Sequence, residues 1–211
     1  MIATTASERP RDPRNGIDHA KARRIDMKKG PFEETARTIK YQNSWIRVEE
    51  ASVIRPNGEK GIFGLVHMKP GSTVLALDAR ERVLLIREYK YAVERETLEL
   101  VSGGIDEDED PSAAALRELR EETGYRAQKL TPLGCIEPFT TVIASINHIF
   151  LAEELVFDPL PGSREDIVEP HWVRFASAMA MLEAGTIAHA ASCVGLLKTA
   201  VMLRERQHGK K

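Results

Sequence analysis

The sequence has few cysteines, no long apolar run and no excess of basic charge. Cys135 and Cys193 lie far apart and form neither a CxxC pair nor a Cys/His metal spacing, so we expect two buried thiols in a reducing compartment, the cytoplasm. No stretch approaches the roughly 18 apolar residues of a membrane span, and the N-terminus lacks the apolar core of a secretory signal. The formal net charge of −2 argues against nucleic acid as a partner, but it does not exclude small phosphorylated ligands.

The 211 residues are enough for one domain with a full core. Residues 1–38 are polar and lack clear periodicity, and we expect them to form a disordered segment. The turn residues Pro56-Asn57-Gly58 separate two apolar runs and predict a β-hairpin. Strands are predicted over 44–54, 62–68, 72–78, 82–89, 97–101, 133–136, 146–151 and 167–175, and helices over 111–123, 176–185 and 190–206. This order of elements suggests a mixed sheet covered by helices.

The helix predicted over 111–123 has clear signals at both ends. Asp110 suits the N-cap, Pro111 suits the first helical position, and Gly124 suits a left-handed C-terminal cap. The helix therefore begins and ends where the sequence marks it.

Three glutamates gather near the end of this helix. Glu118, Glu121 and Glu122 are spaced by three and four residues, which places them on neighbouring rows of one face. Like charges at this spacing repel one another, and the negative end of the helix dipole adds to the penalty. One interpretation is a solvated face with Glu–Arg pairs. The other is a site for a hard cation such as Mg²⁺, which prefers oxygen ligands.

The wider spacing decides between these interpretations. From Gly103 the chain runs glycine, five residues, Glu109, seven residues, Arg117-Glu118, two residues, Glu121-Glu122, one residue, Gly124. This pattern resembles the Nudix box, and every fixed position matches, with Tyr125 a mild departure at the last apolar position. The resemblance implies an α/β fold, a Nudix α/β/α sandwich with a mixed sheet and a small N-terminal β extension. It divides the chain into a β extension over 39–70, through which members of this family commonly form homodimers, and a hydrolase domain over 71–205.

The resemblance also implies roles for individual residues. Mg²⁺, or Mn²⁺ in its place, would be held by Glu118, Glu121, Glu122 and the backbone carbonyl of Ser102. Arg117 would orient a carboxylate, most simply Glu109, and Gly103 and Gly124 would be structural. A loop glutamate would act as the catalytic base, which maps to Glu165 with Asp166 as its neighbour. The implied catalytic residues are thus Glu109, Arg117, Glu121 and Glu165.

The flanking segments resemble the branch of this family that hydrolyses ADP-ribose and other nucleoside-diphosphate sugars. The triplet Glu88-Tyr89-Lys90 stands where the branch has Gln-Tyr-Arg, and Glu99 fits an acidic position before the glycines. Lys90 keeps the positive charge of arginine but loses its bidentate geometry. Pro138 lacks the glycine that usually follows it in ADP-ribose hydrolases, which leaves other nucleoside-diphosphate sugars open.

Several remaining residues have two interpretations. Trp45 could stack on a nucleobase or pack in a core or interface, and Tyr89 could line the sugar site or be packed. Trp172 is expected in the core. The histidines His148, His171 and His189 show no metal spacing and are expected in core or surface positions.

The implied reaction is Mg²⁺-dependent hydrolysis of the diphosphate bond of a nucleoside-diphosphate-sugar substrate, giving a nucleoside monophosphate and a sugar phosphate. One alternative is hydrolysis of another nucleoside diphosphate derivative, such as a dinucleotide polyphosphate, NADH or a capped RNA end. A second alternative is a non-catalytic regulator that senses ADP-ribose. An intact box argues against the second.

Overall fold

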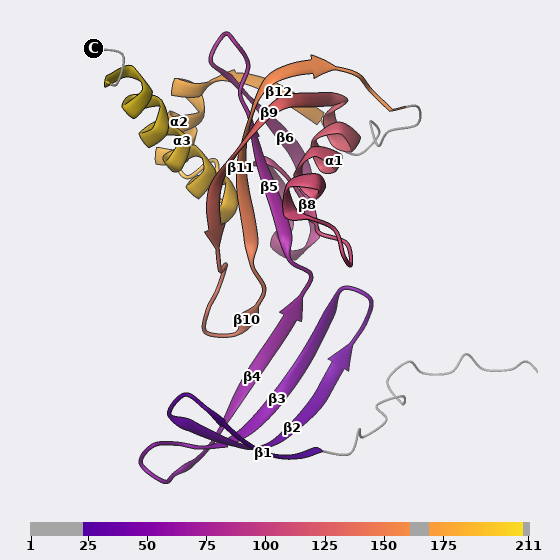
Figure 1. Cartoon of the computed structure of the whole chain (residues 1–211), viewed down its shortest axis with the longest axis vertical. Helices are drawn as coiled ribbons and strands as arrows, with labels where there is room; N and C mark the ends of the chain where they lie inside the picture. The colour runs from indigo at the N-terminus through magenta and orange to yellow at the C-terminus, as the bar shows by residue number, and fades with distance from the viewer. Residues whose placement is uncertain (1–22, 161–168, 209–211) are drawn as a thin grey trace, which may run out of the picture.

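The computed structural model describes residues 23–160 and 169–208. Its body contains a four-stranded sheet in the order β8 (Val101–Gly104), β5 (Gly71–Ala76), β11 (Asn147–Phe157), β9 (Tyr125–Ile136), and a three-stranded sheet in the order β12 (Glu169–Arg174), β6 (Arg82–Lys90), β7 (Arg95–Glu99). Helix α1 (Pro111–Thr123) lies on one side of these strands, and α2 (Phe175–Glu183) and α3 (Ala190–His208) lie on the other (Figure 1). Strands β5 and β11 are parallel and the other pairs in the body are antiparallel, so the predicted α/β/α sandwich with mixed pairing is confirmed.

The core has two layers because the central strands are apolar on both faces. In β5, Val74 and Ala76 pack with Leu119 of α1, whereas Leu75 packs with Leu196 of α3 on the opposite face. These side chains are almost fully buried. Full burial of one leucine contributes about 1.5–3 kcal/mol. Both flanking layers are therefore firmly attached to the strands.

The N-terminal extension is an antiparallel sheet of β1 (Arg23–Lys29), β2 (Phe32–Gln42), β3 (Ile46–Ile54) and β4 (Lys60–Met68), to which the short β10 (Ile143–Ala144) adds in parallel. It extends away from the body in Figure 1. The predicted hairpin at Pro56–Gly58 is confirmed, since Ile54 pairs with Lys60 across this turn.

The prediction of a disordered segment to residue 38 is wrong for residues 23–38, which form β1 and most of β2. The reason is a buried charge network that apolar periodicity does not detect. Glu34 is only 2% exposed, and Arg37 donates to its two carboxylate oxygens at 2.7 and 2.6 Å. Arg37 also contacts buried Glu49 of β3 at 3.1 Å. The hydrogen bonds from Arg37 hold the pKa of Glu34 below its ordinary value despite burial.

The strand predicted over 97–101 is divided at Leu100, where the chain leaves one sheet and enters the other. The backbone N–H of Leu100 donates to the hydroxyl of Ser192 in α3 at 2.9 Å instead of to a strand. The predicted strands 72–78 and 82–89 also fall in separate sheets, joined only by a bridge between Leu77 and Val83. This crossing brings Ser102–Gly104 beside β5, directly before the loop that leads to α1.

Other expectations can be compared directly with the structure. Trp172 packs edge-on against Tyr125 with ring centroids 5.4 Å apart, which confirms its place in the core. Cys135 and Cys193 are free thiols, but Cys135 is exposed and Cys193 is only half-buried, which differs from the prediction of two buried thiols. The pairing of β9 with β11 is irregular between Pro132 and Gly134, just before Cys135. Within residues 23–160 and 169–208, no helix is both long enough and apolar enough to cross a membrane.

Candidate active site

Helix α1 is fixed at both ends and along one side. The Asp110 carboxylate accepts a hydrogen bond from the Ser112 N–H at 2.8 Å, and Gly124 adopts a φ of 71° that only glycine tolerates easily. The bounds Pro111–Thr123 agree with the prediction, and Leu119 is fully buried against the sheet. The glutamates of the box are thus carried on a rigid element.

Arg117 links the loop before α1 to two glutamates of the helix. Its guanidinium donates to both oxygens of Glu109, at 2.8 and 2.9 Å, and to the backbone carbonyl of Gly104 at 2.9 Å. The same group reaches Glu118 at 2.6 Å and Glu121 at 3.2 Å. The resemblance to the Nudix box implied the contact between Arg117 and Glu109, and the structure contains it.

These contacts shift the ionisation of both partners. The hydrogen bonds from Arg117, followed by the Asp106 backbone N–H, lower the pKa of Glu109 to about 2. The Glu109 carboxylate in turn raises the pKa of Arg117 well above its ordinary value. Both groups are therefore charged at neutral pH.

The lowered pKa of Glu109 predicts acid sensitivity with a definite sign. The folded-state pKa of about 2 lies below the ordinary value of 4.5, so the stabilisation is present above about pH 4.5 and is lost as the pH falls towards 2. We expect Glu109→Gln to lower the melting temperature at neutral pH. The difference in melting temperature between wild type and variant should become smaller as the pH falls below 4.5.

Thermal unfolding followed by circular dichroism across this pH range measures the gap. Glu107→Gln, an exposed position in the same loop, is the matched control and should give no pH-dependent gap. A gap for Glu109→Gln that stays constant down to pH 2 would contradict an ionised Glu109–Arg117 pair.

Gly103 forms a cradle for the Glu118 carboxylate. A Cβ added to Gly103 would coincide with the carboxylate atoms of Glu118, closer than any real side-chain contact. The φ of Gly103 is not in the left-handed region, so the need for glycine here comes from the close approach alone. The Glu118 side chain is held in this cradle at 13% exposure.

A second charged group lies next to the cradle, where a small cavity is lined by Ile86, Glu88, Lys90, Glu99, Leu100, Ser102 and Glu122. The Lys90 ammonium donates to Glu88 at 2.6 Å and lies 4.0 Å from Glu99. Burial lowers the pKa of Lys90, but the Glu88 hydrogen bond and the charges of Glu99, Glu88 and Glu122 outweigh it, so that the net shift is upward. Lys90 therefore remains a cation among carboxylates.

His189 joins this group, although its sequence position predicted only a core or surface role. Its Nδ1 lies 3.4 Å from Glu99 and 2.9 Å from the Ser192 hydroxyl. Burial, opposed by Glu99 and aided by Lys90, lowers the pKa of His189. No local motif indicates this contact, since it depends on the packing of α3 against the turn at Leu100.

The remaining predicted residues are distributed differently. Ser102 lies in β8 beside Thr73, whose hydroxyl is 2.9 Å from its own. Tyr89 is 57% exposed and Trp45 is 72% exposed, so neither is a packed core residue. Trp45 lies in the turn between β2 and β3, at the end of the extension nearest the body, because the following residue Ile46 pairs with Met68. Glu165 and Asp166 lie outside the described residues.

The donors gathered here fit a divalent cation in chemical type. Glu118, Glu121 and Glu122 and the Ser102 carbonyl offer only oxygen, which suits Mg²⁺ or Mn²⁺. Over the described ranges, no three His, Cys, Asp or Glu side chains form a ready-made metal cluster. Arg117 contacts Glu118 and Glu121, whereas Lys90 contacts Glu88 and lies 4.0 Å from Glu99. The cradle at Gly103 places a carboxylate directly against the end of β8, which supports the fit.

Comparison with known proteins matches the NUDIX domain to residues 67–192. The chain is 27% identical over 159 residues to the CMP-5'-(N-acetyl-N-hydroxy-3-aminopropyl)phosphonate hydrolase of Streptomyces rubellomurinus (strain ATCC 31215), which covers 75% of this chain and 77% of that protein. It is 35% identical over 100 residues to the ADP-ribose pyrophosphatase of Bacillus subtilis (strain 168), over 47% of this chain and 54% of that protein. A crystal structure of an ADP compounds hydrolase superposes with a TM-score of 0.71 at 25% identity, over 81% of this chain and 92% of the other.

Proposed function

The chain belongs to the NUDIX domain family and is a Nudix hydrolase, and we propose that it hydrolyses the diphosphate bond of ADP-ribose or a related nucleoside-diphosphate sugar with Mg²⁺. The products would be a nucleoside monophosphate and a sugar phosphate. The observation that carries the proposal is the position of Glu118 and Glu122 of α1 against Ser102 and Gly103 of β8, next to the group around Lys90.

The chain's own residues would bind and orient the reacting groups. Mg²⁺, or Mn²⁺ in its place, would be held by Glu118, Glu121, Glu122 and the Ser102 carbonyl. When bound, such an ion polarises phosphate oxygens and lowers the pKa of water. Arg117 would keep the carboxylates of Glu109, Glu118 and Glu121 in fixed orientations through charged hydrogen bonds.

Proton removal from the attacking water would fall to Glu165, with Asp166 as the neighbouring candidate. This assignment comes from the family resemblance of the segment before β12. Substrate contacts would come from Lys90 and Glu99 beside the glutamates, and from the exposed rings of Tyr89 and Trp45. A charged ammonium at Lys90 suits a phosphate oxygen, and an exposed aromatic ring suits a nucleobase.

The N-terminal extension would serve assembly. Ile39, Tyr41 and Ile62 of this sheet expose large apolar surfaces, which favours pairing with a second copy of the chain. The unit of assembly would be the whole strand-rich extension from residue 23, earlier than the predicted start at residue 39. Two free thiols suit a reducing compartment such as the cytoplasm.

A substrate panel tests the reaction. With Mg²⁺, we expect ADP-ribose or another diphosphate sugar to be hydrolysed faster than diadenosine polyphosphates, NADH or a nucleoside triphosphate. The panel should include a CMP-linked phosphonate, because the similarity to the Streptomyces hydrolase leaves the base open. Chromatography of the released nucleotides identifies the bond that is cut. Absence of turnover on every diphosphate sugar with Mg²⁺ or Mn²⁺ would contradict the proposal.

A further inference from the structure

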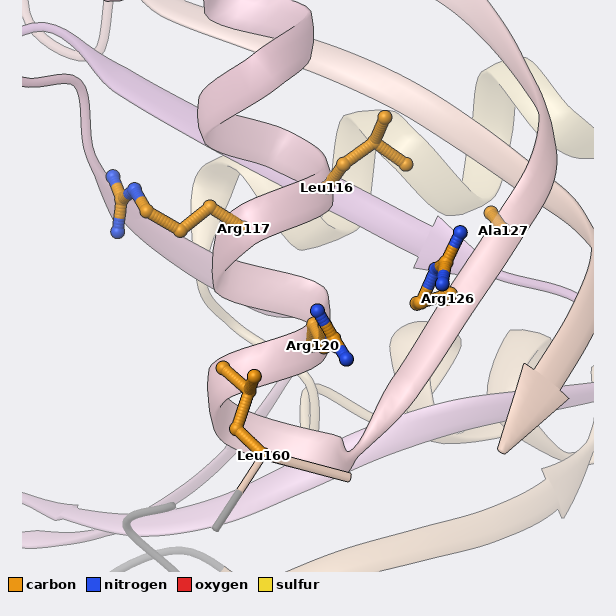
Figure 2. Close-up of a pocket in the computed structure, with 6 residues that line it drawn as sticks. All are labelled: Leu116, Arg117, Arg120, Arg126, Ala127 and Leu160. Atoms are coloured by element: carbon orange, nitrogen blue, oxygen red, sulfur yellow. The ribbon is translucent and has the colours of Figure 1, made fainter. Parts of the chain in front are cut away.

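A second pocket lies on the far side of α1 from the cradle. It has a volume of about 540 Å³ and is lined by Leu116, Arg117, Arg120, Arg126, Ala127 and Leu160. Figure 2 shows Leu116 and Arg120 on α1 near Arg126 and Ala127 of β9, with Arg117 extending to the other side of the helix. At about 100° per residue, Arg120 lies about 160° round the helix from both Glu118 and Glu122. This pocket is therefore separate from the candidate active site.

Two of its arginines already bind one anionic oxygen. Arg120 donates through Nη2 to Asp158 Oδ2 at 2.8 Å, and Arg126 donates through Nη1 to the same oxygen at 3.1 Å. Arg120 also holds the Asp158 backbone carbonyl at 3.0 Å, and the Asp158 N–H donates to the Gly124 carbonyl at 2.8 Å. The two guanidiniums are thus fixed to converge on a negatively charged oxygen at the C-terminal end of α1.

The charges in this arrangement do not balance. Among the residues that the structure describes here, two arginines face one carboxylate, an excess of one positive charge, and a guanidinium has five N–H donors. Arg120 uses two of them here and Arg126 uses one. Arg117 does not contribute, because its guanidinium is occupied by the carboxylates of the active site. The donors that remain on Arg120 and Arg126 suit a phosphate, which arginine binds in bidentate fashion.

The other residues that line the pocket indicate which chemical group would be attached to the phosphate. Leu116, Ala127 and Leu160 supply apolar walls beside the guanidiniums. The volume lies within the roughly 300–1,000 Å³ usual for small-molecule sites, so a bare phosphate would leave most of it unfilled. A flat base packs against apolar side chains and stacks on arginine better than a sugar rich in hydroxyls does. We propose that this pocket binds a nucleoside monophosphate at a site distinct from the active site.

Binding of AMP to the full chain tests this proposal. Isothermal titration in EDTA, without divalent metal, keeps the measurement independent of the proposed reaction. We expect saturable binding of AMP, and binding at least tenfold weaker for adenosine and for inorganic phosphate. Arg126→Gln should weaken AMP binding about tenfold, since it removes a charged hydrogen bond at an exposed position. Arg204→Gln, an exposed arginine on α3, is the matched control and should bind as wild type does.

A second variant moves affinity in the opposite direction, which misfolding could not imitate. Asp158→Asn removes the carboxylate that competes for both guanidiniums, so AMP should bind several-fold more tightly. Thermal unfolding of each variant confirms that it is folded. The proposal is overturned if Arg126→Gln binds AMP as wild type does, if inorganic phosphate binds as well as AMP, if no saturable binding occurs, or if Asp158→Asn binds no more tightly.

Discussion

Replacing Glu122 by glutamine should lower kcat on the best diphosphate sugar by on the order of 100- to 1,000-fold while the protein stays folded. Glu122 lines the small cavity with Glu99, Lys90 and Ser102, where its charge contributes to the raised pKa of Lys90. Glutamine keeps the shape of the side chain but removes the charge that a divalent cation requires. Steady-state kinetics at saturating Mg²⁺ measures the loss.

Stability should change little in this variant, because the lost attraction to Lys90 opposes the relief of repulsion within α1. Glu118 and Glu122 lie at helical spacing near the negative end of the α1 dipole, so loss of one charge removes repulsion. Glu205→Gln, an exposed glutamate on α3, is the matched control and should leave both kcat and the melting temperature unchanged. A kcat for Glu122→Gln within a few-fold of wild type would show that the metal site lies elsewhere.

Local chemistry made α1 predictable from sequence. Asp110, Pro111 and Gly124 each satisfy a need that arises within a few residues, and the helix has the bounds that they predict. The resemblance to the Nudix box implied that Arg117 would reach Glu109, and both sides of that contact belong to one loop and helix. Features of the fold that depend on residues close together in the sequence were therefore predicted correctly.

Contacts between residues far apart in the sequence were not predicted. Residues 23–38 have too few apolar side chains to show strand periodicity, yet Glu34 and Arg37 fit a sheet because Glu49 of another strand completes their network. The break at Leu100 depends on Ser192, far along the chain in α3. His189 reaches Glu99 for the same reason.

The pocket behind α1 is a further case of a feature built from distant residues. Arg120 belongs to the box helix, Arg126 to β9 and Asp158 to the segment after β11. In the sequence, Arg120 resembles a counter-charge for the neighbouring glutamates of α1. In the structure it contacts Asp158, and Arg117 contacts Glu118 and Glu121 of the helix. A helical wheel places Arg117 and Arg120 on different faces of α1, but the partners of each arginine become clear only in the folded structure.

Gly103→Ala should impair catalysis although it adds only one methyl group. Its new Cβ would coincide with the Glu118 carboxylate, so Glu118 must leave its cradle and break its 2.6 Å contact with Arg117. We expect kcat/KM to fall about 10- to 100-fold, since displacement of a positioned group by about 1 Å has effects of this size. The fold should lose little stability, because the displaced atoms are the end of a flexible side chain that can move aside. Titration with Mn²⁺ should show weaker binding, because a donor has moved.

The adjacent Gly104 provides the control for this substitution. A Cβ on Gly104 would meet only Lys69 Cδ at 3.7 Å, an ordinary contact, and neither glycine has a positive φ. Gly104→Ala therefore makes the same chemical change one residue along the same strand without entering the cradle, and it should retain activity and Mn²⁺ affinity. If the two variants lose activity equally, activity depends on the backbone flexibility of the two glycines at the end of β8 and not on the space that Gly103 leaves for Glu118. If only Gly103→Ala is impaired, the close approach of β8 to Glu118 is what sets the geometry of the glutamates proposed to bind the metal.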